Sequence, residues 1–298
     1  MIAPSSPHLD RPLVDVAAWA RHFSQQPIPV LAESAAAVAA LAERYAEGFV
    51  VDANFIVKFL GHDPLMTLRI LSHVALQRGG RHEFQVETIT EALGVIGIRP
   101  FFSAFSHLSV LHVLLKDQPE ALHAAHEVME RGRRAGRFAL GFCRYRMGKE
   151  ERFQGGHHVW GHRWRAAQSQ QAAELHDFSE LLLWVHAPAL ALRVRRLQQE
   201  QPGLGSAQAQ RMVLRIELDE LQKDLMRAWR MPGLLISMSD PQQAVHPDVR
   251  SVLLAVRLAR HLAHGWENPA LRGDILEVAE LLELSPQQAR QLLVRLDS

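Results

Sequence analysis

Apolar residues recur every three or four positions along most of the chain, and this spacing restricts what the chain can fold into. Within residues 131–145, for example, Ala135, Phe138 and Phe142 fall on one stripe of a helix. No convincing run alternates apolar and polar residues, as half-buried strands do. Because 48% of the residues are hydrophobic, the helices can bury a substantial core. The sequence therefore predicts an all-α globular fold.

Glycines, prolines and small polar residues divide this pattern into separate helices. Asp63 precedes Pro64, which is the arrangement of an N-cap and a first helical residue. Thr88 and Ser285 are likewise predicted to cap the helices that follow them. The periodicity further predicts continuous helices over residues 101–115, 119–147, 169–187 and 206–229, with a loop at residues 148–165.

The overall charge and the single cysteine exclude several classes of protein. The formal net charge is +1, so the whole molecule has no field that attracts nucleic acid or a membrane surface. Cys143 is the one cysteine, which rules out a disulfide within the chain. The first residues lack the pattern of a signal peptide, and the longest apolar stretch, residues 35–42, is too short to span a bilayer. We therefore expect a cytoplasmic protein without a membrane partner. Glycine-rich nucleotide-binding motifs are absent, so we expect no cofactor.

Four short motifs follow one another in the order found in a known family. Asp63-Pro64-Leu65 begins a predicted helix, and residues 89–97 read Ile-Thr-Glu-Ala-Leu-Gly-Val-Ile-Gly. Further along are Leu175-His176-Asp177 and a helix end, Trp229-Arg230-Met231-Pro232, which is similar to a Leu-x-x-x-Trp-x-Leu-Pro pattern. In order and spacing, these motifs resemble the HDOD family over about residues 28–240.

This resemblance implies an all-α fold in which an HD-domain-like helical bundle is preceded by an N-terminal helical lobe. We expect the first lobe at residues 28–117, after an N-terminal extension at residues 1–27. The HD-like lobe would occupy residues 118–245. The remaining helices, at residues 246–298, would close that second lobe.

The resemblance also implies a function. HDOD proteins are usually regarded as non-catalytic modules of bacterial signal transduction, often in circuits linked to cyclic-di-GMP. We therefore expect this chain to act through contacts with other signalling proteins. The grooves between its lobes and around His176 and Asp177 would be the binding surfaces.

An alternative is a metal-dependent phosphohydrolase of the HD type with substituted ligands. Such an enzyme needs a first His, the His-Asp pair and a later Asp around a metal that activates water. His176 and Asp177 are present, but the helix expected to supply the first His carries arginines there. Asp219 and Asp240 could serve as replacement carboxylates. We expect His176 and Asp177 to form a buried, hydrogen-bonded pair that locks helices together, with metal binding as the second interpretation.

The densest histidine cluster, His157, His158 and His162, falls in the predicted loop. His158 and His162 could share one face of a helix and bind zinc or nickel. Because glycines lie on both sides of the cluster, we favour a solvated loop, with adventitious metal binding as the alternative.

Arginines lie opposite the apolar stripe of residues 131–145. Arg133, Arg137 and Arg144 share this face of the predicted helix. One interpretation is a solvated face whose charges pair with acids elsewhere in the chain. The other is a surface for an acidic partner or an anion, including a phosphate-bearing ligand.

The C-terminal residues 274–298 have the spacing of a helix-turn-helix, with Ser285 and Pro286 beginning the second helix. This segment contains five acidic residues and two arginines, a net charge of −3. Because that charge repels phosphates, we expect a closing helical hairpin. A DNA-binding regulator that uses these helices is the less favoured alternative, and nucleic acid is not an expected partner.

Overall fold

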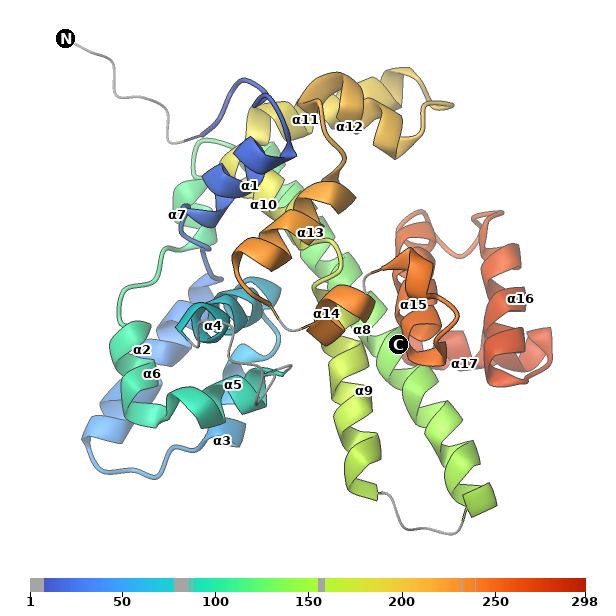
Figure 1. Cartoon of the computed structure of the whole chain (residues 1–298), viewed down its shortest axis with the longest axis horizontal. Helices are drawn as coiled ribbons and strands as arrows, with labels where there is room; N and C mark the ends of the chain where they lie inside the picture. The colour runs from blue at the N-terminus through green and yellow to red at the C-terminus, as the bar shows by residue number, and fades with distance from the viewer. Residues whose placement is uncertain (1–7, 78–85, 87, 155–158, 232, 239) are drawn as a thin grey trace. The chain divides into compact units, whose positions relative to one another are not determined.

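The structure, a computed structural model, describes residues 8–77, 86, 88–154, 159–231, 233–238 and 240–298. These residues form helices joined by turns and short loops (Figure 1), and the predicted all-α fold is confirmed. The one extended pairing among them is an isolated bridge between Val30 and Val110. No helix within these ranges is both long enough and apolar enough to cross a lipid bilayer.

The chain forms two compact units and passes between them more than once. Unit 1 consists of residues 1–128 and 177–231, and unit 2 consists of residues 129–176 and 232–298. One crossing lies within α8 (Pro119–Gln154), one lies between His176 and Asp177, and one follows Met231. The division into lobes along the chain order stays a prediction.

Unit 1 is built from two stretches of chain. The first contributes α1 (Val16–Ser24), α2 (Ala32–Ala46), α3 (Ala53–Leu60), α4 (Pro64–Gln77), α5 (Ile89–Ile96), α6 (Ile98–Ala104), α7 (Leu111–Leu114) and the beginning of α8. The second contributes α10 (Phe178–His186), α11 (Pro188–Glu200), α12 (Ser206–Leu214) and α13 (Leu218–Ala228). The two stretches join where α1 packs along α13, and the indole N–H of Trp19 donates to the carbonyl of Leu214 at 3.2 Å.

Unit 2 combines the remainder of α8 with α9 (Val159–Glu174), α14 (Gly233–Met238), the short 3₁₀ helix η1 (Pro241–Gln243), α15 (Pro247–Leu262), α16 (Leu271–Leu282) and α17 (Pro286–Asp297). α15 packs on α9, α14 and α16, and α16 packs on α17 as a helical hairpin. The carboxylate of Asp274 in α16 is buried, and it accepts from Nε of Arg257 at 2.8 Å. Its second oxygen lies 2.5 Å from Nδ1 of His261. These contacts hold α16 against α15.

Asp63 determines how the first helices of unit 1 are joined. Its buried carboxylate accepts from the N–H groups of Leu65 at 2.9 Å and Met66 at 3.1 Å, which is the predicted N-cap of α4. The other carboxylate oxygen accepts from the N–H of Leu31 at 2.8 Å, immediately before α2. One side chain therefore satisfies backbone donors from two separate parts of the chain.

The other two predicted caps are also confirmed. The hydroxyls of Thr88 and Ser285 each accept from the backbone N–H three residues later. Their own N–H groups donate to the side chains of Glu91 and Gln288, which completes the arrangement called a capping box. The helices that begin there, α5 and α17, therefore start where the sequence indicates.

Several predicted helix boundaries are wrong. α8 continues through Gly148 to Gln154, so the predicted loop at residues 148–165 is largely helical. Residues 101–115 separate into the end of α6 and α7, and residues 169–187 separate into α9 and α10. Residues 206–229 separate into α12 and α13, where Arg215 adopts a left-handed φ of 66°. Apolar residues stay on the buried side across these breaks, so the periodicity alone looks continuous.

Replacing Asp63 with alanine should destabilise unit 1. The Asp63→Ala change leaves three backbone N–H groups without their acceptor, and we expect a loss of about 2–4 kcal/mol in the free energy of unfolding. Asp52→Ala is the control, because Asp52 is an exposed N-cap that accepts from Phe55 alone. That variant should lose about 1 kcal/mol in urea unfolding. Equal losses would contradict the joining role of Asp63.

Candidate functional site

His176 and Asp177 lie in the turn between α9 and α10, not within a helix. Both side chains are partly buried. The N–H of His176 bonds to the carbonyl of Ala173 at 3.3 Å, a three-residue spacing that tightens the end of α9. Asp177 has φ −106° and ψ 24°, which lies outside the helical region. The pair marks one of the points where the chain passes from unit 2 into unit 1.

The last turn of α9 reaches this point in close contact with α8. A Cβ atom placed on Gly132 would lie 2.7 Å from the backbone carbonyl oxygen of Glu174. One placed on Gly136 would lie 2.5 Å from Cγ of Glu174. Because the two glycines are four residues apart, they share one face of α8. That face has no side chains at these positions, so the end of α9 can approach the α8 backbone directly.

The carboxyl group of Glu174 is carried into this contact. Gln170, one turn earlier on α9, donates to Oε1 of Glu174 at 2.8 Å. Burial raises the pKa of Glu174 to about 7, although the Gln170 bond and the charges of Arg133 and Arg137 act in the opposite direction. This carboxyl group therefore changes its charge close to neutral pH.

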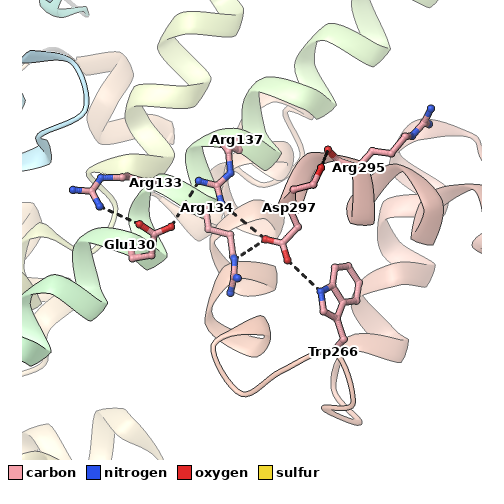
Figure 2. A network of polar contacts seen from close by, with 8 residues as sticks. Glu130, Arg133, Arg134, Arg137, Trp266, Arg295 and Asp297 are labelled. Carbon is pink, nitrogen blue, oxygen red and sulfur yellow. Dashed lines mark hydrogen bonds and ion pairs between the residues drawn. The ribbon is translucent and has the colours of Figure 1, made fainter. Parts of the chain in front are cut away.

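Arginines from α8 form a network with two carboxylates, shown in Figure 2. Nη1 of Arg133 lies 3.0 Å from Oε2 of Glu130, on the same helix. Nε of Arg134 lies 2.7 Å from Oδ1 of Asp297, at the end of α17. The Asp297 side chain is only 11% exposed, so the second pair is better shielded from solvent than the first. The network therefore ties the end of the chain to α8.

Arg137 lies between these two pairs (Figure 2). Arg144 takes no part in the ion pairs that Glu130 and Asp297 make with α8. The guanidinium of Arg137 is 3.8 Å from Glu130 and 4.0 Å from Asp297. Arg144 is exposed about two turns further along α8. Of the three arginines that the sequence places on one face, the structure therefore brings together Arg133 and Arg137.

The candidate metal ligands belong to both compact units, with Asp177 and Asp219 in unit 1 and His176 and Asp240 in unit 2. Asp219 lies exposed in the first turn of α13. Asp240 accepts from the N–H of Gln242 at 3.2 Å, within its own turn. Across the described ranges, no group of three or more His, Cys, Asp and Glu side chains is arranged to hold a metal ion.

The comparison with known proteins identifies the family. The HDOD domain family matches residues 28–245, well over half of the chain. The chain belongs to the HDOD family. The resemblance carried by the four sequence motifs is therefore confirmed. No curated protein matches the chain.

Two solved structures are similar to this HDOD protein over most of its length. One is the MmoQ response regulator from Methylococcus capsulatus, at 18% identity and a TM-score of 0.59, covering 91% of this chain and 99% of the other. Another is a virulence factor from Campylobacter jejuni, at 13% identity and a TM-score of 0.59, covering 90% of this chain and 88% of the other. At these identities the similarity shows a shared fold.

The predicted histidine cluster is only partly within the described residues. His157 and His158 lie outside them. His162 belongs to α9, so its predicted place in a loop is wrong. The helical pattern resumes earlier than the glycines suggest, because glycine weakens a helix by only about 1 kcal/mol and neighbouring residues can compensate.

Glu174 and Asp297 were not predicted as part of the site. The available signal was the spacing of Gly132 and Gly136, which is typical of a close contact between helices. Nothing local pairs Asp297 with the arginines of α8, because they lie at distant positions in the chain.

The α8–α9 contact can be tested with two glycines of the same helix. Gly132→Ala places a methyl group against the backbone of Glu174, and we expect a loss of about 1–3 kcal/mol in the free energy of unfolding. Gly148→Ala is the matched control, because a Cβ there meets nothing within 4 Å. It should be neutral or gain up to about 1 kcal/mol in urea unfolding. A neutral Gly132→Ala variant would contradict the close contact.

The raised pKa of Glu174 predicts how stability varies with pH. An unfolded Glu titrates near 4.5 and this folded one at about 7, so between these values the folded protein binds more protons. The contribution of Glu174 to stability should therefore fall as the pH rises through this range. Glu174→Gln cannot ionise, so the unfolding free energy of the wild type minus that of the variant should decrease as the pH rises from about 4.5 to about 7.

The variant and the wild type must be compared at the same pH, because His186 makes the free energy of unfolding vary with pH in the opposite direction. Burial lowers the pKa of His186 from 6.5 to about 4, so its contribution is lost as the pH falls. Glu130→Gln serves as the control, since the Glu130 side chain is 58% exposed. If Glu174→Gln and the wild type show parallel pH profiles, the assigned pKa shift is wrong.

Proposed function

We propose that this protein is a non-catalytic regulatory module of bacterial signal transduction that acts by binding other proteins. The observation that carries the proposal is the HDOD family match over residues 28–245. The similar Methylococcus capsulatus structure is named a response regulator, which agrees with a signalling role for this fold. Circuits linked to cyclic-di-GMP are the setting that the family resemblance suggests.

A group of exposed apolar side chains in unit 1 supports binding to a protein. This aromatic surface consists of Tyr45, Phe49, Val50 and Phe59, with Phe49 53% and Val50 93% exposed. The guanidinium of Arg44 lies 5.2 Å from the centre of the Phe49 ring, so a charged group borders the apolar atoms. Arg44 also lies 5.9 Å from the centre of the Phe55 ring, and that ring packs 5.2 Å from Phe59. Exposed apolar side chains gathered in this way are typical of interaction sites.

The enzyme alternative has less support. The described residues hold His176 and Asp177 without a group of metal-ligating side chains around them. An HD-type hydrolase needs that group, because the metal activates the attacking water. We therefore propose that the pair has a structural role at the α9–α10 turn.

The DNA-binding alternative also has less support. The C-terminal hairpin, residues 274–298, has a net charge of −3, which opposes binding to phosphates.

The interaction proposal can be tested by affinity capture from the native host. Wild-type protein, a Phe49→Ser/Phe59→Ser variant and a Val113→Ser control are compared, since Val113 is 57% exposed in α7 and lies outside the aromatic surface. We expect a protein retained by the wild type and the control to be lost from the double variant. Equal retention by all three would contradict the aromatic surface.

A parallel measurement separates regulation from catalysis. We expect purified protein to contain less than stoichiometric iron, manganese or nickel and to lack phosphodiesterase activity, with His176→Ala unchanged in both. Stoichiometric metal together with activity that the His176→Ala and Asp177→Ala variants lose would overturn the non-catalytic proposal.

A further inference from the structure

Arg137 has unused hydrogen-bonding capacity within the network. At 3.8 Å from Glu130 and 4.0 Å from Asp297, its guanidinium is within ion-pair range of both carboxylates but too far for a direct hydrogen bond. Its Nε is buried and has no hydrogen-bond partner among the described residues. The side chain is nevertheless 41% exposed. A planar group with five donors is therefore held in place and accessible from solvent.

Both nearby carboxylates make shorter contacts with other side chains than with Arg137. Oε2 of Glu130 receives Arg133 at 3.0 Å. Oδ1 of Asp297 contacts Arg134 at 2.7 Å, and its Oδ2 accepts from the indole N–H of Trp266 at 3.2 Å. Arg137 therefore lies between two carboxylates, and each carboxylate makes its shortest contact with a side chain other than Arg137.

The charges of the network leave a cationic surplus. Arg133, Arg134 and Arg137 carry three positive charges, and Glu130 and Asp297 carry two negative ones. Glu174 is the next acid, and burial raises its pKa to about 7, so at lower pH it does not cancel the surplus. Below this pH the guanidinium groups of the network therefore outnumber its charged carboxylates by one.

We propose that Arg137, together with Arg133 one turn earlier, binds a tetrahedral oxyanion of the phosphate class. Two guanidinium groups at positions i and i+4 are about 6 Å apart at their Cβ atoms, and a phosphoryl group can accept from both. Arginine suits this role because its donors form a fixed fork that matches the oxygens of phosphate. The site does not depend on the proposed protein interaction and can be tested on purified protein alone.

The test is a titration with sulfate and with inorganic phosphate at about pH 6 and constant ionic strength, because general screening also weakens surface ion pairs. Calorimetry follows binding to the wild type, Arg137→Gln, Arg133→Gln and the control Arg144→Gln. Arg144 is the matched control, since it lies on the same helix and outside the network. Circular dichroism verifies that each variant keeps its helices.

We expect saturable binding of the anion to the wild type. The affinity should be about tenfold or more weaker in Arg137→Gln, and the loss should be smaller in Arg133→Gln. Arg144→Gln should stay within about twofold, since its charge is remote from the site. Titrating free phosphoserine and a phosphoserine peptide then distinguishes a small ligand from a phosphorylated protein segment. The absence of saturable binding to the wild type, or an equal loss in Arg144→Gln, would overturn the site.

Discussion

The contact between the end of α9 and the backbone of α8 is the constraint on which the site depends. Glycine at positions 132 and 136 lets the carbonyl and side chain of Glu174 lie where a methyl group would otherwise be. This approach brings a carboxyl group close to Arg133 and Arg137, at the residue where α9 ends. His176 and Asp177 then follow in the turn. The close helix contact that these two glycines allow therefore places the carboxyl group of Glu174 beside the arginines.

The two compact units contain buried titratable groups that respond to pH in opposite directions. In unit 2, burial raises the pKa of Glu174 towards neutrality, because desolvation disfavours the ionised carboxylate. In unit 1, burial lowers the pKa of His186, because desolvation disfavours the imidazolium; its ring packs 5.6 Å from that of Phe23. The stability of each unit should therefore have its own pH dependence. A single unfolding midpoint measured for the whole chain would average the two.

The function proposed for this HDOD protein does not need chemistry at the His-Asp pair. The motifs that resemble the family lie at helix starts and turns of the structure, at Asp63, His176 and Trp229. Asp63 bonds to backbone donors from two separate parts of the chain, and Trp229 is buried against Phe178. Motifs of this kind therefore indicate the fold, and the function has to be argued from the site.

The sequence was most informative where structure depends on neighbouring residues. The caps at Asp63, Thr88 and Ser285 follow from side chains that bond to backbone groups within three residues, so they could be predicted directly. The breaks after Glu174 and Leu214 could not, because the buried face continues across them and the period does not change. The arginine face of α8 was predicted, but the sequence could not show which of its members have partners.

By itself, the sequence determined the all-α class, the family and most helix starts, because periodicity and capping are local properties. Only the tertiary structure decided that Asp297 pairs with Arg134, that Glu174 lies against Gly132, and that Arg144 stays outside the network. These contacts join residues far apart in the chain, or depend on how one helix meets another. Their energies come from burial and charge in a shared environment, which exists only once the chain has folded.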